Sequence, residues 1–195
     1  HPRTDTSTLI KTMKAGQWTV TWTDLHDIPE IWRNRTPITP TSITDLLTGI
    51  AKHQRPQRIL DPWSGIGSTL IPVVDSTKAP HATGISIVPA ETAIAQAMTG
   101  GLPIKWINDR PTTALDGLGE YDLIVSGPPV GLENDTITLH DDGKDVRLRG
   151  GATYTIVLKS TEHLTKDGCA MFVLPDGFLF HEDTAPVRDA LARHG

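Results

Sequence analysis

Short apolar runs alternate with stretches of helical spacing along the chain from residue 39 onwards. Apolar runs of about 4–8 residues that end at turn-forming residues indicate buried strands, and apolar residues three or four positions apart indicate helices. The predicted strands are Arg58–Asp61, His81–Val88, Ile104–Ile107, Tyr121–Val125 and Cys169–Leu174. Helices are predicted from Pro40 onwards and at Thr69–Val74, Glu91–Met98, Tyr154–Leu164 and Pro186–Arg193. This alternation predicts an α/β fold with a doubly wound, mainly parallel sheet.

The first part of the chain lacks this regular alternation. Its pattern predicts a short helix at Thr8–Lys14, a strand at Trp18–Trp22 and a connector at Asp24–Arg35. We therefore expect two parts, an N-terminal segment at residues 1–38 that packs on the core, and the core itself at residues 39–195.

The composition excludes several classes of protein. With 37% hydrophobic and 21% charged residues among 195, the chain has a globular composition rather than a disordered or fibrous one. It contains no run of about 18 apolar residues that could span a membrane, and no apolar leader is visible. The net charge of −5 gives no overall basic surface for nucleic acid. Contact with DNA would therefore need a local patch or another part of the protein.

Cysteine and histidine usage bears on the compartment and on metals. The single cysteine, Cys169, excludes an internal disulfide and a thiolate zinc cluster, and it fits a reducing compartment. The histidines are scattered without the spacing of metal ligands. We predict a cytoplasmic protein with no metal site and no membrane partner.

The turn after the first predicted strand, Asp61–Ser68, is the most informative segment. Its glycines let a ligand approach the backbone closely, and an acid at the end of a strand can accept from an amine or a hydroxyl. A strand-to-helix turn without a ligand has the same pattern, so the glycines alone leave both interpretations open. A phosphate-binding P-loop is excluded, because no Gly-Lys-Ser/Thr follows the turn.

Four motifs follow one another along the core. They are Thr39-Pro40, Asp61-Pro62-Trp63-Ser64-Gly65-Ile66-Gly67-Ser68, Ser126-Gly127-Pro128-Pro129-Val130-Gly131 and Leu174-Pro175-Asp176-Gly177-Phe178-Leu179-Phe180. In this order and spacing they resemble the N6-adenine DNA methyltransferases, and most closely the modification subunits of type I restriction systems. The resemblance implies a Rossmann-like class I methyltransferase fold, S-adenosylmethionine as cofactor, and methyl transfer to an exocyclic amine of DNA.

The resemblance also implies partners. DNA, a specificity subunit and a restriction subunit are expected, with DNA contacted through domains or subunits outside this chain. The family sheet continues beyond its fifth strand, so we expect the chain to be truncated at its C-terminus and to lack a target-recognition domain.

The resemblance assigns the cofactor to the glycine turn and to the ends of the next two strands. Asp61 would lie near the amino group of the methionine end, and Asp109 would accept from the adenine amino group, although a helix N-cap is the alternative role for Asp109. In the family, an acid at the end of the second strand binds the ribose hydroxyls of the cofactor. This chain has Ser86 at that position, and a serine hydroxyl lacks the charge that roughly doubles the strength of such a hydrogen bond. Glu91 is expected to lie one helical turn too late to replace that acid. The remaining residues assigned to the methionine end are Thr39, Pro40, Pro62, Ser64, Gly65 and Gly67.

The catalytic motif departs further from the family. Gly127, before Pro128 and Pro129, offers no side-chain acceptor for the target amine, and Val130 offers no ring to stack on the base. Such a polar contact is typically worth about 2.7–4 kcal/mol and such stacking about 1–3 kcal/mol. Ser126 is a poor substitute, because strand alternation turns its side chain to the opposite face.

Three functions stay open on this motif. The chain is a methyltransferase with an altered DNA target, a catalytically inactive scaffold or DNA-contacting subunit of a restriction-modification-type complex, or a methyltransferase acting on RNA or protein. Fold alone does not separate them.

One charged segment is a candidate for nucleic-acid contact. The stretch His140–Gly151 is predicted to be a flexible loop, and it carries Lys144, Arg147 and Arg149. In the family this region lies near the DNA, so these three side chains could contact phosphates. A solvated surface loop is the alternative, because the same stretch holds several aspartates.

Overall fold

A computed structural model describes residues 38–129, 134–141 and 144–194. The helix, strand and connector predicted between residues 8 and 35, and Val130 of the catalytic motif, lie outside the described residues.

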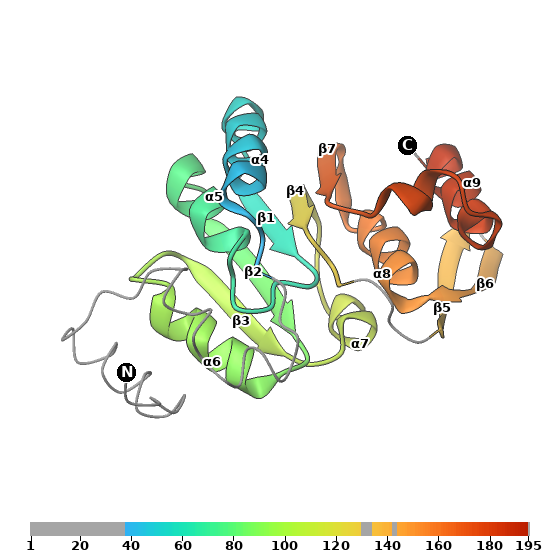
Figure 1. Cartoon of the computed structure of the whole chain (residues 1–195), viewed down its shortest axis with the longest axis horizontal. Coiled ribbons are helices and arrows are strands. Elements are labelled where there is room, and N and C mark those ends of the chain that lie inside the picture. Colours follow the sequence, from blue (N-terminus) through green and yellow to red (C-terminus); the bar gives the residue numbers. More distant parts are fainter. Residues whose placement is uncertain (1–37, 130–133, 142–143, 195) are drawn as a thin grey trace.

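A parallel sheet of five strands in the order β3-β2-β1-β4-β7 forms the centre of the structure (Figure 1). The chain lays down β1, β2 and β3 in one direction and then crosses back, so that β4 pairs with the other side of β1. Sheets of this type bind ligands at the carboxyl ends of the strands where the direction reverses, here between β1 and β4. The predicted α/β, doubly wound parallel sheet is confirmed. The strands are β1 (Arg58–Asp61), β2 (His81–Ser86), β3 (Ile104–Asn108), β4 (Tyr121–Ser126) and β7 (Leu164–Phe172).

Helices cover both faces of this sheet, which explains why its central strands β1 and β4 are mostly buried and apolar. Ile59 and Leu60 are neighbours on β1, yet they pack into different apolar clusters and both are fully buried. The cluster around Ile59 includes side chains of α4 and α5, and the cluster around Leu60 includes Leu115 of α7. None of the described helices is long and apolar enough to cross a membrane. The helices are α4 (Thr41–Gln54), α5 (Leu70–Thr77), α6 (Pro89–Met98), α7 (Pro111–Leu115), α8 (Ala152–Thr161) and α9 (Ala185–His194).

The last strand begins earlier than its apolar pattern predicts. Helix α8 ends at Thr161 rather than Leu164, and β7 begins at Leu164 rather than Cys169. Leu164 already pairs with Tyr121, but the register shifts before Cys169 pairs with Leu123. The residues within this irregularity are mostly polar, so the hydrophobic pattern alone could not reveal it.

The segment predicted to be a flexible loop is instead part of a β-hairpin. Strands β5 (Asn134–Asp141) and β6 (Lys144–Gly151) pair antiparallel in a sheet of their own. Ile137 of β5 is 3% exposed and packs with an apolar cluster that includes Leu158 of α8 and Val187 of α9. The prediction was wrong because the charged and glycine residues outweighed the alternating Thr136–Leu139, which is typical of a half-buried strand.

Candidate functional site

Asp61 ends β1 at the point where the strand order reverses. Its side chain is 1% exposed, and its Oδ1 accepts hydrogen bonds from the Ser126 hydroxyl at 2.6 Å and from the Trp63 backbone N–H at 3.0 Å. Burial raises the pKa of Asp61 from 3.8 to about 7, and the hydrogen bonds from Ser126 and Trp63 oppose that rise. A carboxyl group that titrates near neutrality therefore lies between β1 and β4, and such perturbed groups cluster at functional sites.

Ser126 and Gly127 differ in direction, as strand alternation predicts. Ser126 is buried, and its hydroxyl donates to Asp61 on the neighbouring strand. A Cβ atom on Gly127 would instead lie 3.6 Å from Thr39 Oγ1 and 3.8 Å from Val173 Cβ. Ser126 therefore serves Asp61 and does not replace the missing side chain at position 127.

The glycine turn is fixed to β2. Ser64 donates to the Ile85 carbonyl twice, from its backbone N–H at 2.8 Å and from its hydroxyl at 3.0 Å. Gly65 and Gly67 have φ values of 52° and 84°, in the left-handed region that favours glycine. A Cβ on Gly67 would lie 2.7 Å from the Trp106 ring, so packing against β3 requires glycine there independently of any ligand.

Thr39 and Pro40 lie against the end of the same turn. The Thr39 backbone N–H donates to Ser68 Oγ at 3.2 Å, and the Oγ1 atoms of Thr39 and Thr69 share a hydrogen bond at 2.7 Å. Pro40 is the N-cap residue of α4, and its carbonyl accepts hydrogen bonds from N–H groups in the first turn of that helix. The structure thus brings Thr39, the glycine turn and Gly127 together, although they are far apart in the sequence.

Glu91 lies in contact with Ser86, and the expectation that it would be too far away was wrong. The Ser86 hydroxyl donates to Glu91 Oε2 at 2.6 Å, and both side chains are buried. Helix α6 begins at Pro89, with only two residues between it and the end of β2, so its first turn places Glu91 next to the strand end. Sequence spacing measured from the strand could not reveal this contact without the start of the helix.

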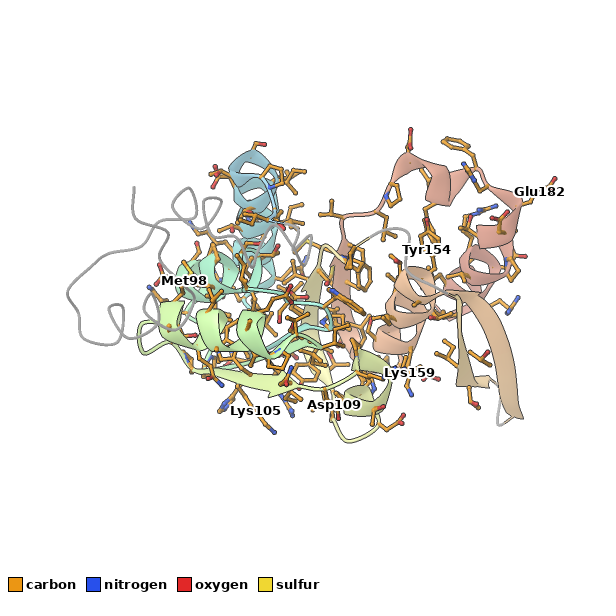
Figure 2. All side chains as sticks on the ribbon, turned by 60° about the horizontal axis from the view of Figure 1, so that its bottom comes forward. Met98, Lys105, Asp109, Tyr154, Lys159 and Glu182 are labelled. Carbon is orange, nitrogen blue, oxygen red and sulfur yellow. The ribbon has the colours of Figure 1, made fainter. Side chains whose placement is uncertain are left out.

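Asp109 follows β3 beside the start of α7, while Lys105 lies towards the other end of that strand (Figure 2). Asp109 Oδ1 accepts a hydrogen bond from the Arg110 backbone N–H at 2.6 Å. No side chain caps α7, so the N-cap role of Asp109 is not observed. The sequence interpretation missed Asn108, whose Nδ2 donates to the Ser86 carbonyl at 2.8 Å. The signal that could have identified Asn108 is its position as a polar residue at the end of a strand, next to Asp109.

The proline pair is attached to the start of α8. Pro128 is buried, and the carbonyl of Pro129 accepts a hydrogen bond from the hydroxyl of the buried Thr153. Gly127 is not among the residues with positive φ, so its backbone conformation does not demand glycine. The fold therefore does not require glycine at position 127.

Lys144, Arg147 and Arg149 lie on β6, where their backbones pair with Asp141, Thr138 and Thr136. Helix α8 contacts the hairpin as well as β7 of the central sheet, and Figure 1 shows it between the two. Within the part of the chain that the structure describes, there is no cluster of His, Cys, Asp or Glu that could hold a metal ion.

Solved structures with a fold similar to this one include methyltransferases. No family model matches the chain, and no curated protein matches it. A Listeria monocytogenes protein, assigned as a class I S-adenosylmethionine-dependent methyltransferase, is similar with a TM-score of 0.67 at 17% identity, over 97% of this chain and 60% of that one. A Geobacter sulfurreducens methyltransferase is similar with a TM-score of 0.56 at 17% identity, over 88% of this chain and 79% of that one.

A protein of Vibrio vulnificus, assigned as a modification subunit of a type I restriction enzyme, is also similar. Its TM-score is 0.64 at 14% identity, and the match covers 96% of this chain and 44% of that one. The chain thus spans 60% of the Listeria protein and less than half of the Vibrio protein. At these identities the likeness establishes the fold, which is the Rossmann-like fold of class I methyltransferases.

Proposed function

We propose that the chain is an S-adenosylmethionine-dependent methyltransferase domain that resembles the N6-adenine DNA methylases. The observation that carries the proposal is the buried Asp61 at the point where the strand order reverses, beside a glycine turn and Thr39. The fold shared with class I methyltransferases, and the modification subunit among the similar structures, support it.

The residues at this edge fit the chemistry of the cofactor. An ammonium group favours a carboxylate partner, which Asp61 supplies, and sugar hydroxyls and an adenine amine favour the oxygen acceptors at the ends of β2 and β3. When bound, S-adenosylmethionine supplies an electrophilic methyl group on a sulfonium. The protein's own residues would hold the amino group at Asp61 and orient the target amine beside Gly127, Pro128 and Pro129, which is catalysis by positioning.

The proposed substrate is an exocyclic amine of DNA, and the partners are DNA and subunits of a restriction-modification-type complex in the cytoplasm. The order of the four motifs supports this substrate class, and Lys144, Arg147 and Arg149 are the proposed phosphate contacts. Because Gly127 offers no acceptor to the amine, a non-catalytic scaffold that retains the cofactor is the second candidate.

Calorimetric titration with S-adenosylmethionine tests the proposal. We expect micromolar binding by the wild type, and a loss of at least tenfold in Asp61→Asn, because a charge-assisted hydrogen bond is worth about 1.5–3 kcal/mol. Gly65→Asp, which crowds the turn, is expected to abolish binding. Asp75→Asn is the matched control, since among the described residues the Asp75 carboxylate forms only an exposed ion pair with Lys78. A folded wild-type chain that binds nothing would contradict the proposal.

The two candidate functions are separated by transfer of a labelled methyl group. Incubation of the wild type with labelled cofactor and unmethylated DNA, RNA or protein reports which substrate class accepts the group. Label on adenine N6 supports the DNA enzyme. Tight cofactor binding without transfer to any class supports the scaffold.

A further inference from the structure

The carboxyl end of β2 carries a buried pair of a hydroxyl and a carboxylate. Ser86 is 3% exposed and Glu91 is 6% exposed, and the hydrogen bond between Ser86 Oγ and Glu91 Oε2 is 2.6 Å long. Ser86 Oγ also accepts the Val88 backbone N–H at 3.2 Å, which directs the hydroxyl proton to Glu91. The geometry thus fixes both the donor and the acceptor of the pair.

This pair is more than a helix cap. The N-cap residue of α6 is Val88, and no side chain caps the helix. A negative charge is favourable in the first turn of a helix, where Glu91 lies, but burying a carboxylate is costly unless its oxygens are hydrogen-bonded. An apolar residue would fill a buried position of α6 at lower cost, so the retained carboxylate points to a role.

Hydrogen bonds from neighbouring elements hold the backbone of β2 beside this pair. The Ile85 carbonyl accepts from Ser64 of the glycine turn at 3.0 Å, and the Ser86 carbonyl accepts from Asn108 at the end of β3 at 2.8 Å. The last two residues of β2 are therefore tied to the polar residues on both sides. Ser86 and Glu91 lie between the turn proposed for the methionine end and the strand end proposed for the adenine.

We propose that Glu91 is the acid that accepts the ribose hydroxyls of S-adenosylmethionine, and that Ser86 is the residue that positions it. This inference rests on the proposed function. A carboxylate has about four acceptor sites and Ser86 occupies one of those of Glu91, so the group can accept from more than one hydroxyl. The charge missing from the end of β2 is thereby supplied from the first turn of α6.

The test combines one protein change with one ligand change. Glu91→Gln keeps the shape and an oxygen that accepts from Ser86, but it removes the charge. We expect Glu91→Gln to weaken S-adenosylhomocysteine binding by about tenfold to a hundredfold in calorimetry, the range for a hydrogen bond to a charged group. Glu91→Gln should change the affinity for the S-adenosylhomocysteine analogue that lacks both ribose hydroxyls by less than about twofold. That analogue cannot form the contact that the substitution removes.

A relocation variant sharpens the test. Ser86→Asp combined with Glu91→Gln returns the carboxylate to the strand end, and we expect it to bind S-adenosylhomocysteine within about threefold of the wild type. Glu182→Gln, at an exposed position outside the site, is the matched control and should bind as the wild type does. If Glu91→Gln does not fold, Ser86→Ala replaces it, with a smaller loss that is again confined to the ligand with hydroxyls.

The outcomes separate this inference from the proposed function. A Glu91→Gln variant that binds S-adenosylhomocysteine as tightly as the wild type, or that loses affinity for the deoxygenated analogue to the same extent, overturns the role of Glu91 and leaves the function standing. Wild-type chain that binds neither ligand overturns the proposed function itself.

Discussion

The two halves of the carboxyl edge of the sheet differ in what they retain. The half formed by β1, β2 and β3 holds buried acids with hydrogen-bond partners, Asp61 with Ser126 and Glu91 with Ser86. The half that follows β4 has Gly127 where a polar acceptor is expected, although neither space nor backbone conformation demands glycine there. The residues proposed to bind the cofactor are therefore more complete than those proposed to orient the substrate.

The largest effect on stability is expected at Gly67, in the half of the edge formed by β1, β2 and β3. Gly67→Ala places a Cβ at φ 84° and 2.7 Å from Trp106, whose ring lies between β3 and the turn. A left-handed conformation and overpacking together should lower the free energy of unfolding by about 2–5 kcal/mol, measured by urea denaturation.

The control for Gly67 is Gly49, a helical glycine with nothing within 4 Å of an added Cβ. Gly49→Ala should be neutral or stabilise α4 by up to about 1 kcal/mol, the difference in helix propensity. Equal effects at the two positions would mean that the turn is not under the packing constraint described above.

The half of the edge that follows β4 is tested by introducing the polar and aromatic side chains that are expected there. Gly127→Asn combined with Val130→Phe supplies the amide acceptor and the aromatic ring, and its Cβ contacts at position 127 are ordinary ones. We expect methyl transfer to adenine to rise by about 10²–10³-fold, the typical value of one such polar contact. The measurement is incorporation of labelled methyl into duplex DNA.

Gly127→Ala serves as the matched control for that gain, because it adds a Cβ without an acceptor. A gain as large in Gly127→Ala would show that the amide is not what the site lacks. No gain in either variant would favour the scaffold.

The ionisation of Asp61 should make the free energy of unfolding depend on pH. Because burial raises its folded-state pKa from 3.8 to about 7, the folded chain binds the proton more tightly than the unfolded chain between those values. The contribution of Asp61 to stability is therefore fully present at low pH and is lost as pH rises through 7, by about 3 kcal/mol between pH 5 and pH 8. Urea denaturation at the two values should show this fall, and Asp61→Asn should remove it.

Cofactor binding should show the opposite dependence, since the ammonium of the cofactor favours ionised Asp61. Affinity for S-adenosylmethionine is expected to rise between pH 6 and pH 8 in the wild type and to stay flat in Asp61→Asn. Affinity that is flat in both would remove Asp61 from the proposed binding residues.

The smallest effect is expected at the opposite, amino edge of the sheet. Tyr121 donates from its hydroxyl to Thr83 Oγ1 at 3.0 Å, in a buried contact between β4 and β2. Tyr121→Phe should cost about 1 kcal/mol of stability, the usual net value of a hydrogen bond, and leave cofactor affinity unchanged. A change in affinity would mean that the two edges are coupled.

The sequence predicted what depends on local pattern. The strands at the centre of the sheet are apolar on both faces, so runs such as Arg58–Asp61 and Tyr121–Val125 were visible without any structure. The turn at Asp61 and the nearby Thr39 were also visible, because motif residues identified them. The start of β7 was not visible, since polar residues interrupt its pairing with β4.

The contacts of the site depend on geometry that spacing does not record. Glu91 reaches Ser86 because only two residues separate α6 from β2, and Asn108 reaches the Ser86 carbonyl because β3 pairs with β2. The hairpin was missed because charged residues concealed the alternation around Ile137. In each case the deciding partner lies on another element.

The hairpin β5–β6 has one further consequence. Its first and last residues, Asn134 and Gly151, pair with each other, and the Thr153 hydroxyl holds the Pro129 carbonyl where the excursion leaves and rejoins the core. An excursion closed at its base can lengthen, shorten or change its surface without moving β4 or α8. The fold therefore has a place where the surface of the molecule can change while the contacts at the carboxyl edge of the sheet stay as they are.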